Sequence, residues 1–244
     1  MVPSDLETLE RLFPVSLCRY PLKEGDVGLV IVDPGRGFTR EGNLSDPTHM
    51  VPMIRRIASL YRELHATLGN HLQVLVFLDT HDPDIPEPPY PPHGIKGTGE
   101  ELIDPELEFL LSEPNVRVIR KDCINGYVGA MYTDKQGEWS EYEGWVVENE
   151  LYTILVCGDC TDICVSDFVL TTLSARNHGR FTLADPSEER DQYVHDITSM
   201  DIVVLADACE TFDAPGHDRE AAHHVGLWMM ATRGAILASS WEMP

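Results

Sequence analysis

The sequence predicts an α/β protein, a three-layer sandwich in which helices cover both faces of a six-stranded, mostly parallel, Rossmann-like sheet. Short continuous apolar runs recur along the chain, and such runs are typical of strands buried on both faces of a parallel sheet. They occupy residues 27–33, 74–79, 116–120, 153–157, 202–207 and 235–239. Segments with apolar residues at helical spacing separate them, which favours successive right-handed βαβ units.

Helices are expected before the first strand and between the strands. Ser4 and Glu7 have the spacing of a capping box, which predicts a helix over residues 4–13. The other helices are expected at residues 48–68, 104–111, 139–150 and 218–231, and from Cys164 onward. Residues 180–200 are acidic and irregular, so we interpret them as a surface insertion in a single domain that spans residues 1–244.

The charge balance limits the partners that the protein can have. Lys and Arg number 18 and Asp and Glu 41, which gives a formal net charge of −23 at pH 7. Such a surface repels phosphate backbones and anionic headgroups, so we expect a small-molecule substrate and neither nucleic acid nor membrane as a partner. No apolar run approaches the roughly 20 residues that span a bilayer, and the six cysteines fit a reducing compartment. We predict a cytoplasmic protein, and we also expect a homo-oligomer.

Residues 154–166, which read ILVCGDCTDICVS, carry the strongest chemical signal. An apolar strand delivers the chain to Gly158, and Cys164 then lies in the first turn of a helix. Helix-terminal N–H groups and the positive end of the helix dipole favour a thiolate there, which lowers the cysteine pKa and predicts a nucleophile. The alternative is a buried cysteine that packs as a small apolar residue. A redox pair of Cys157 and Cys160 is disfavoured, because Cys157 lies in the apolar strand and no second CxxC exists for a zinc site.

Polar residues follow the carboxyl ends of several predicted strands, namely Asp33, Asp79, Lys121 and the turn at residues 158–164. In open α/β sheets the ligand crevice forms at this edge. Taken singly, each aspartate could be a helix cap and the lysine a solvated strand end. The proline-rich segment after the second of these strands cannot form a helix or a central strand, so it holds His93 in a fixed place.

These motifs resemble a known family. VIVD at Asp33, the lysine of RKDCINGYVG and the run GDCTDICV are similar to motifs of the isochorismatase-like cysteine hydrolases. Within that family, the DxH of Asp79 and His81 followed by PPHGIKGTG resembles the nicotinamidases, and DPDIPEPPYPPH, CTDICVSDF and SARNHG resemble the plant-type members. The resemblance spans about residues 28–239. It implies an amidohydrolase that converts nicotinamide to nicotinate and ammonia in NAD salvage.

The resemblance also assigns roles to individual residues. Asp33 would take the proton from Cys164, Lys121 would stabilise their negative charge, and the thiolate would form a thioester with the substrate. The backbone N–H groups of Cys160 and Cys164 would form the oxyanion hole. The peptide bond between Asp159 and Cys160 is expected to be cis.

A metal site follows from the same resemblance. One divalent metal would be held by Asp79, His81 and His93, with water in the remaining positions. Zinc is expected, although iron or manganese also suits these ligands. The metal would hold the ring nitrogen of the substrate, whose ring would lie against Phe38 and Tyr90.

Several features leave alternatives open. Microbial nicotinamidases often carry a further histidine in the loop that corresponds to residues 82–92, and this sequence has none. The same cysteine chemistry could serve a ureido or maleamate-type amide, or the chain could be a non-catalytic thiol or binding protein on the same fold. An isochorismate-type vinyl ether hydrolase is less favoured, because that branch lacks the nucleophilic cysteine. His223 and His224 point about 100° apart on a helix, so we interpret them as helix-surface or partner-contact residues.

Overall fold

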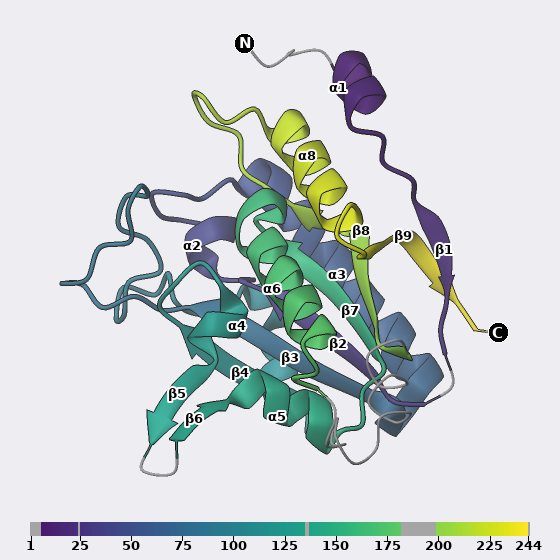
Figure 1. The fold of residues 1–244 in the computed structure, drawn as a ribbon. Helices are drawn as coiled ribbons and strands as arrows, with labels where there is room; N and C mark the ends of the chain where they lie inside the picture. Colours follow the sequence, from purple (N-terminus) through teal and green to yellow (C-terminus); the bar gives the residue numbers. More distant parts are fainter. Residues whose placement is uncertain (1–5, 24, 135–136, 182–198, 244) are drawn as a thin grey trace.

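Seven parallel strands form the middle layer of the structure, a computed structural model that describes residues 6–23, 25–134, 137–181 and 199–243. The strand order is β1-β9-β8-β7-β2-β3-β4. The strands are β1 Cys18–Pro21, β2 Val27–Val32, β3 Leu72–Asp79, β4 Val116–Lys121, β7 Thr153–Asp159, β8 Asp201–Glu210 and β9 Ile236–Glu242. Figure 1 shows α3 behind this sheet and α5, α6 and α8 in front of it. The predicted α/β sandwich is therefore confirmed.

The sheet has one strand more than the six predicted. Strand β1 was not predicted, because it has only four residues, of which only Tyr20 is buried, and ends in a proline. It pairs with β9 at the edge of the sheet. A separate antiparallel hairpin, β5 Met131–Asp134 and β6 Gly137–Ser140, was also missed. Its outer residues are exposed, so it lacks the apolar run that marks a central strand.

The helices largely follow the apolar periodicity. They are α1 Leu6–Leu12, α2 Arg36–Thr39, α3 Pro47–Leu68, α4 Gly126–Gly129, α5 Glu141–Glu148, α6 Ser166–Asn177 and α8 Arg219–Ala231. Two 3-10 segments, η1 Gly69–His71 and η2 Pro105–Ser112, and one π-helical segment, η3 Thr161–Val165, join them. Among the described helices, none combines the length and the apolar character that a membrane crossing needs.

Two helix predictions need correction, and part of a third lies outside the described residues. The segment expected as a helix at residues 104–111 is the 3-10 segment η2, capped by the Asp104 side chain. The helix expected at residues 139–150 begins only at Glu141, because the Ser140 side chain caps it by accepting from the Glu143 N–H and the two preceding residues pair in β6. Ser4 of the expected capping box and residues 182–198 of the expected insertion lie outside the described residues. The single domain, the homo-oligomer and the cytoplasmic location stay predictions.

The strand order reverses between the neighbouring strands β2 and β7, and the functional residues lie near this switch point. From β2 the sheet grows through β3 to β4, and from β7 it grows the other way through β8 to β9. Every residue of β2 and β7 is buried, as the continuous apolar runs predicted. Gly158 adopts φ +119°, and a Cβ atom there would lie 2.1 Å from the Val32 carbonyl oxygen. Only glycine lets the two strands approach this closely, and ligand crevices form at such a switch point.

Candidate active site and metal-binding cluster

Two buried acids and a lysine meet at the carboxyl edge of the sheet. Asp33 follows β2 directly, Asp79 ends β3 and Lys121 ends β4. The Lys121 Nζ atom lies 2.8 Å from Asp33 Oδ2 and 2.9 Å from Asp79 Oδ1, and it also donates to the Cys123 carbonyl at 2.9 Å. The side chains of Asp33 and Lys121 are fully buried. The structure thus brings these three predicted residues together, and it excludes a solvated strand-end role for Lys121.

Burial sets the protonation behaviour of this group. It raises the pKa of Asp33 to about 7, against the Lys121 charge, which lowers it. The two carboxylates keep the pKa of Lys121 well above its usual range even though burial alone would lower it. Lys121 therefore stays charged, and Asp33 can exchange a proton near neutral pH, as a general acid and base must.

Cys164 lies in a turn that is wider than the expected α-helical turn. The Val165 N–H donates to the Cys160 carbonyl five residues earlier at 3.1 Å, which makes residues 161–165 π-helical, and π-helical turns are frequent at functional sites. The preceding Asp159–Cys160 peptide bond is cis, as the family resemblance implies. We call residues 160–165 the nucleophile turn.

The predicted lowering of the Cys164 pKa is wrong for this arrangement. Burial raises the pKa of the thiol well above its usual range, and the opposing effect of the Lys121 charge is smaller. The helix dipole was expected to favour the thiolate, but the cost of burying a charge is larger. To act as a nucleophile, Cys164 therefore needs a base. The buried Asp33 carboxylate, which lies close enough to affect the pKa of the thiol, is the candidate.

Four side chains form a compact cluster with the donor atoms of a metal site. The Nε2 atoms of His81 and His93 lie 2.9 and 3.0 Å from Asp79 Oδ2. The same two nitrogen atoms lie 3.6 and 3.5 Å from Glu87 Oε2. One ligand atom from each of these four residues lies within 4.8 Å of the other three. We call these four residues the metal-binding cluster.

The donor set of the metal-binding cluster fits a divalent ion. Two imidazoles and two carboxylates are ligands that zinc, iron and manganese all accept. His93 Nδ1 lies 2.8 Å from the Pro91 carbonyl, and a hydrogen bond to this oxygen fixes the ring so that Nε2 faces the cluster. Contacts with Asp79 and Glu87 raise the pKa of His93 to about 10, against the effect of burial, and a metal bound at Nε2 would replace this proton.

Glu87 was not predicted as a metal ligand. The family resemblance points to a further histidine in residues 82–92, and this stretch has none, although a carboxylate can fill the same position of a metal site. The signal was present, since the stretch holds only three acidic residues and only Glu87 of these is followed by consecutive prolines. It is half-buried, whereas Asp84 on the same loop is exposed.

A small pocket is lined both by Cys164 and by members of the metal-binding cluster. Phe38 and Tyr90 line it, as expected for the residues that contact a substrate ring. The remaining lining residues are Leu44, Glu87, His93, Ile124, Cys160, Ile163, Cys164 and Phe212. Nearly all of its surface is apolar, which suits a small planar, uncharged ligand.

Phe212 is the least expected of the lining residues. The strand that precedes Phe212 was predicted to end at Asp207, but β8 continues to Glu210 and so brings Phe212 to the carboxyl edge. The apolar pattern does not predict this extension, because polar residues interrupt it within 207–210. Where each strand ends decides which side chains reach the crevice.

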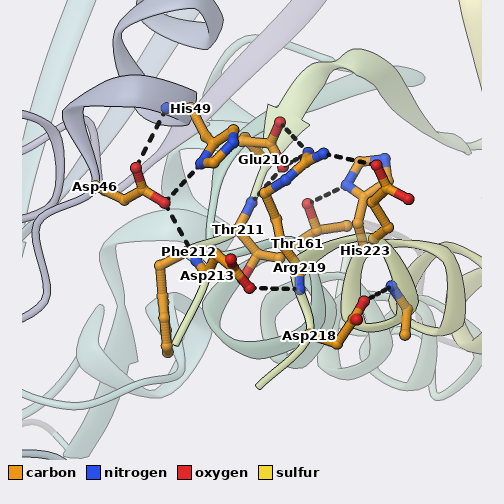
Figure 2. Close-up of polar contacts among 12 residues, drawn as sticks. Asp46, His49, Thr161, Glu210, Thr211, Phe212, Asp213, Asp218, Arg219 and His223 are labelled. Atoms are coloured by element: carbon orange, nitrogen blue, oxygen red, sulfur yellow. Dashed lines mark hydrogen bonds and ion pairs between the residues drawn. The ribbon is translucent and has the colours of Figure 1, made fainter. Parts of the chain in front are cut away.

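Two further predictions concern residues near the pocket. His223 Nδ1 lies 2.8 Å from the Thr161 hydroxyl in the nucleophile turn (Figure 2), and His224 Nε2 lies 2.8 Å from the Phe13 carbonyl. The two rings contact different parts of this chain and both residues are partly exposed, which agrees with a place at the helix surface. A contact with a partner stays a prediction. Cys157 is buried in β7, where its thiol contacts the Val30 carbonyl, and burial raises its pKa.

A cysteine, an aspartate and a lysine that meet at the switch point of a parallel sheet are the arrangement expected of a cysteine hydrolase. The chain matches the family described as the isochorismatase domain over residues 27–242. It therefore belongs to the isochorismatase family, and the resemblance drawn from its motifs is confirmed.

Individual relatives narrow the comparison. The sequence is 42% identical to Nicotinamidase 1 of Arabidopsis thaliana over 233 residues, which cover 89% of this chain and 87% of that protein. The fold is similar to PnC1 from L. infantum in complex with nicotinate, with a TM-score of 0.62, 16% identity and coverage of 93% and 100% of the two chains. It is also similar to the pyrazinamidase of Pyrococcus horikoshii in complex with zinc, with a TM-score of 0.59, 17% identity and coverage of 87% and 98%.

Proposed function

We propose that the protein is a nicotinamidase, an amidohydrolase that converts nicotinamide to nicotinate and ammonia in NAD salvage. One observation carries the proposal: a single apolar pocket is lined by Cys164 and also by Glu87 and His93 of the metal-binding cluster. Cys164 can attack an amide, and the metal-binding cluster can select an amide that carries a ring nitrogen. The 42% identity to a plant nicotinamidase supports the same assignment.

In the first half of the reaction, Asp33 takes the proton of the Cys164 thiol and the sulfur attacks the amide carbon. The carbonyl oxygen becomes an oxyanion, and the backbone N–H groups of Cys160 and Cys164 are the proposed donors to it, each worth about 3 kcal/mol. Asp33 then gives its proton to the amide nitrogen. The carbon–nitrogen bond breaks, ammonia leaves and a thioester on Cys164 remains.

In the second half, Asp33 removes a proton from water, and the resulting hydroxide attacks the thioester carbon. The carbon–sulfur bond breaks and Cys164 recovers its proton through Asp33. The product leaves as nicotinic acid, which loses its carboxyl proton to water and becomes nicotinate. Lys121 stays charged throughout, because its contacts with Asp33 and Asp79 hold its pKa high. Its role is to stabilise the negative charge that passes between the aspartate and the sulfur.

The metal-binding cluster would hold one divalent ion, for which zinc is our proposal, through Asp79, His81, Glu87 and His93. Such an ion would offer a coordination position to the ring nitrogen of the substrate. The aromatic rings of Phe38 and Tyr90 pack near His93, with centroid distances of 5.6 and 6.1 Å, so they lie where they can contact a ring bound at this end of the pocket. A small aliphatic amide would use neither feature.

Ammonia release across a panel of small amides tests the proposal. Nicotinamide should be the best substrate, and benzamide, which lacks the ring nitrogen, together with ureido and maleamate-type amides should be much poorer. Equal or faster hydrolysis of an aliphatic amide would contradict the assignment and favour another substrate for the same cysteine chemistry.

A further inference from the structure

Phe212 forms one wall of the pocket beside Ile163 and Cys164 of the nucleophile turn. It belongs to the β8–α8 loop, residues 211–218, which joins Glu210 at the end of β8 to Arg219 at the start of α8. A connecting loop is usually mobile, and ordering one of its side chains on binding costs free energy. A loop that carries a pocket wall is therefore effective only if other contacts hold it in place beforehand.

Polar contacts fix the base of the β8–α8 loop, as Figure 2 shows. The Arg219 guanidinium donates to both carboxylate oxygens of Glu210, at 3.1 and 3.0 Å. The Asp46 side chain, which caps α3, accepts from the Asp213 N–H at 3.2 Å. The Asp213 carboxylate accepts from the Arg219 N–H at 3.4 Å. Both α3 and α8 thus hold the loop.

The far end of the loop turns back tightly on itself. Residues 214–217 read Ala-Pro-Gly-His, and the His217 N–H donates to the Ala214 carbonyl at 2.9 Å. Gly216 adopts φ +86°, and proline followed by such a glycine is what a type II turn favours at its centre. The turn returns the His217 ring to the Phe212 ring, where the two stack with centroids 4.2 Å apart and planes 20° apart.

His217 also ties Phe212 to the nucleophile turn. Its Nε2 atom lies 2.9 Å from Asp162 Oδ2, and its Nδ1 atom lies 2.9 Å from the Phe212 carbonyl. The other Asp162 oxygen accepts from the Thr211 hydroxyl at 2.7 Å. Asp162 stands two residues before Cys164, so one imidazole links the wall of the pocket to the backbone that carries the nucleophile.

We propose that Phe212 contacts the substrate ring and that His217 is a positioning residue, which acts on the bound ring through Phe212. Of these two rings, Phe212 is among the described residues that line the pocket and His217 is not. Loss of His217 should therefore weaken substrate binding and spare the chemical step. The identity of the ring rests on the proposed function, whereas the link between the two residues does not.

The test is a mutant cycle read as kcat and KM for nicotinamide. His217→Ala should raise KM about tenfold, the scale of a lost aromatic stack with its hydrogen bonds, and leave kcat within about threefold. Phe212→Ala should raise KM at least as much. In the double variant, the loss of His217 should add little to the effect of Phe212→Ala on KM, because the aromatic ring through which His217 acts on the substrate ring is already gone.

Two further variants separate positioning from general stability. His217→Phe keeps a ring to stack on Phe212 and should restore much of the lost affinity. His65→Ala is the matched control, since His65 is an exposed histidine that stacks on Tyr61 in α3, with centroids 5.5 Å apart, and does not line the pocket among the described residues. It should leave KM and kcat unchanged.

Several results would overturn the inference. These are an unchanged KM in His217→Ala, a fall in kcat alone, or additive effects of the His217 and Phe212 changes. Calorimetric titration with nicotinate keeps this test apart from the proposed function. A wild-type protein that binds nicotinate but releases no ammonia from nicotinamide would refute the proposed function only, whereas equal nicotinate affinity in wild type and His217→Ala would refute the role of His217.

Discussion

The two ends of the pocket are built from different parts of the molecule. At one end, Asp33 and Lys121 come from strand ends, and Cys164 comes from the turn after a strand, so the sheet fixes their positions. At the other end, only Asp79 of the metal-binding cluster belongs to a strand, and the other three members lie on the proline-rich segment after β3. Asp79 joins the two ends, because one of its oxygens contacts Lys121 and the other faces the histidines.

This difference suggests that amide hydrolysis and substrate selection depend on different parts of the fold. Paired strands hold their ends in positions that vary little, whereas loops change readily in length and sequence. We infer that the sheet edge performs the amide chemistry and that the loops, including the β8–α8 loop, decide which amide is held.

The largest effect is expected at the nucleophile. Cys164→Ala should lower kcat for nicotinamide at least about a thousandfold, because no other group can form the thioester. Cys160→Ala is the matched control, since only its backbone N–H is used, and it should keep activity within about tenfold. Ammonia release measured beside thermal unfolding distinguishes lost chemistry from lost folding. Equal damage from the two changes would favour a redox pair and contradict the mechanism.

The base and its lysine should have the next largest effect. Asp33→Asn removes the group that moves both protons, and Lys121→Met removes the cation between the two acids. Each should lower kcat at least about a hundredfold, the scale of a lost general base or electrostatic partner. Near-normal steady-state turnover in either variant would mean that the chemistry uses other residues.

Changes in the metal-binding cluster should act on metal affinity and on KM. His93→Ala should weaken zinc binding about a hundredfold and Glu87→Gln about tenfold, and KM should rise in both. Competition with a chromophoric chelator measures the affinity. Asp84→Asn on the same loop is the control, because Asp84 is exposed and does not belong to the cluster. Unchanged zinc affinity in Glu87→Gln would remove Glu87 from the ligand set.

The smallest effect is a change with pH. Burial raises the pKa of Asp33 to about 7, and the carboxylate is the form that accepts the Cys164 proton. Because the ionised fraction grows as the pH rises through this pKa, kcat/KM should increase from pH 6 to pH 8 and then level off, with about half of the plateau value near pH 7. A flat profile over this range would contradict the role of Asp33 as the base.

The sequence predicted the sheet-edge residues better than the loop residues, for a physical reason. Continuous apolar runs locate buried strands, and the residue after each run must lie at the carboxyl edge, which placed Asp33 and Lys121. Glu87 and Phe212 reach the pocket through loop geometry and an extended β8, and neither leaves an apolar pattern. The raised pKa of Cys164 could not be predicted from the sequence either, since the burial that causes it depends on side chains from distant segments.

Substrate preference tests the division between sheet and loops most directly. The measurement is the ratio of kcat/KM for nicotinamide to that for benzamide in the wild type, Lys121→Met and Glu87→Gln. Lys121→Met should lower both values and keep the ratio within about twofold, because it removes stabilisation that both amides share. Glu87→Gln should lower the ratio by about tenfold, because only nicotinamide has a ring nitrogen for the metal. A ratio that falls in Lys121→Met and persists in Glu87→Gln would contradict the account.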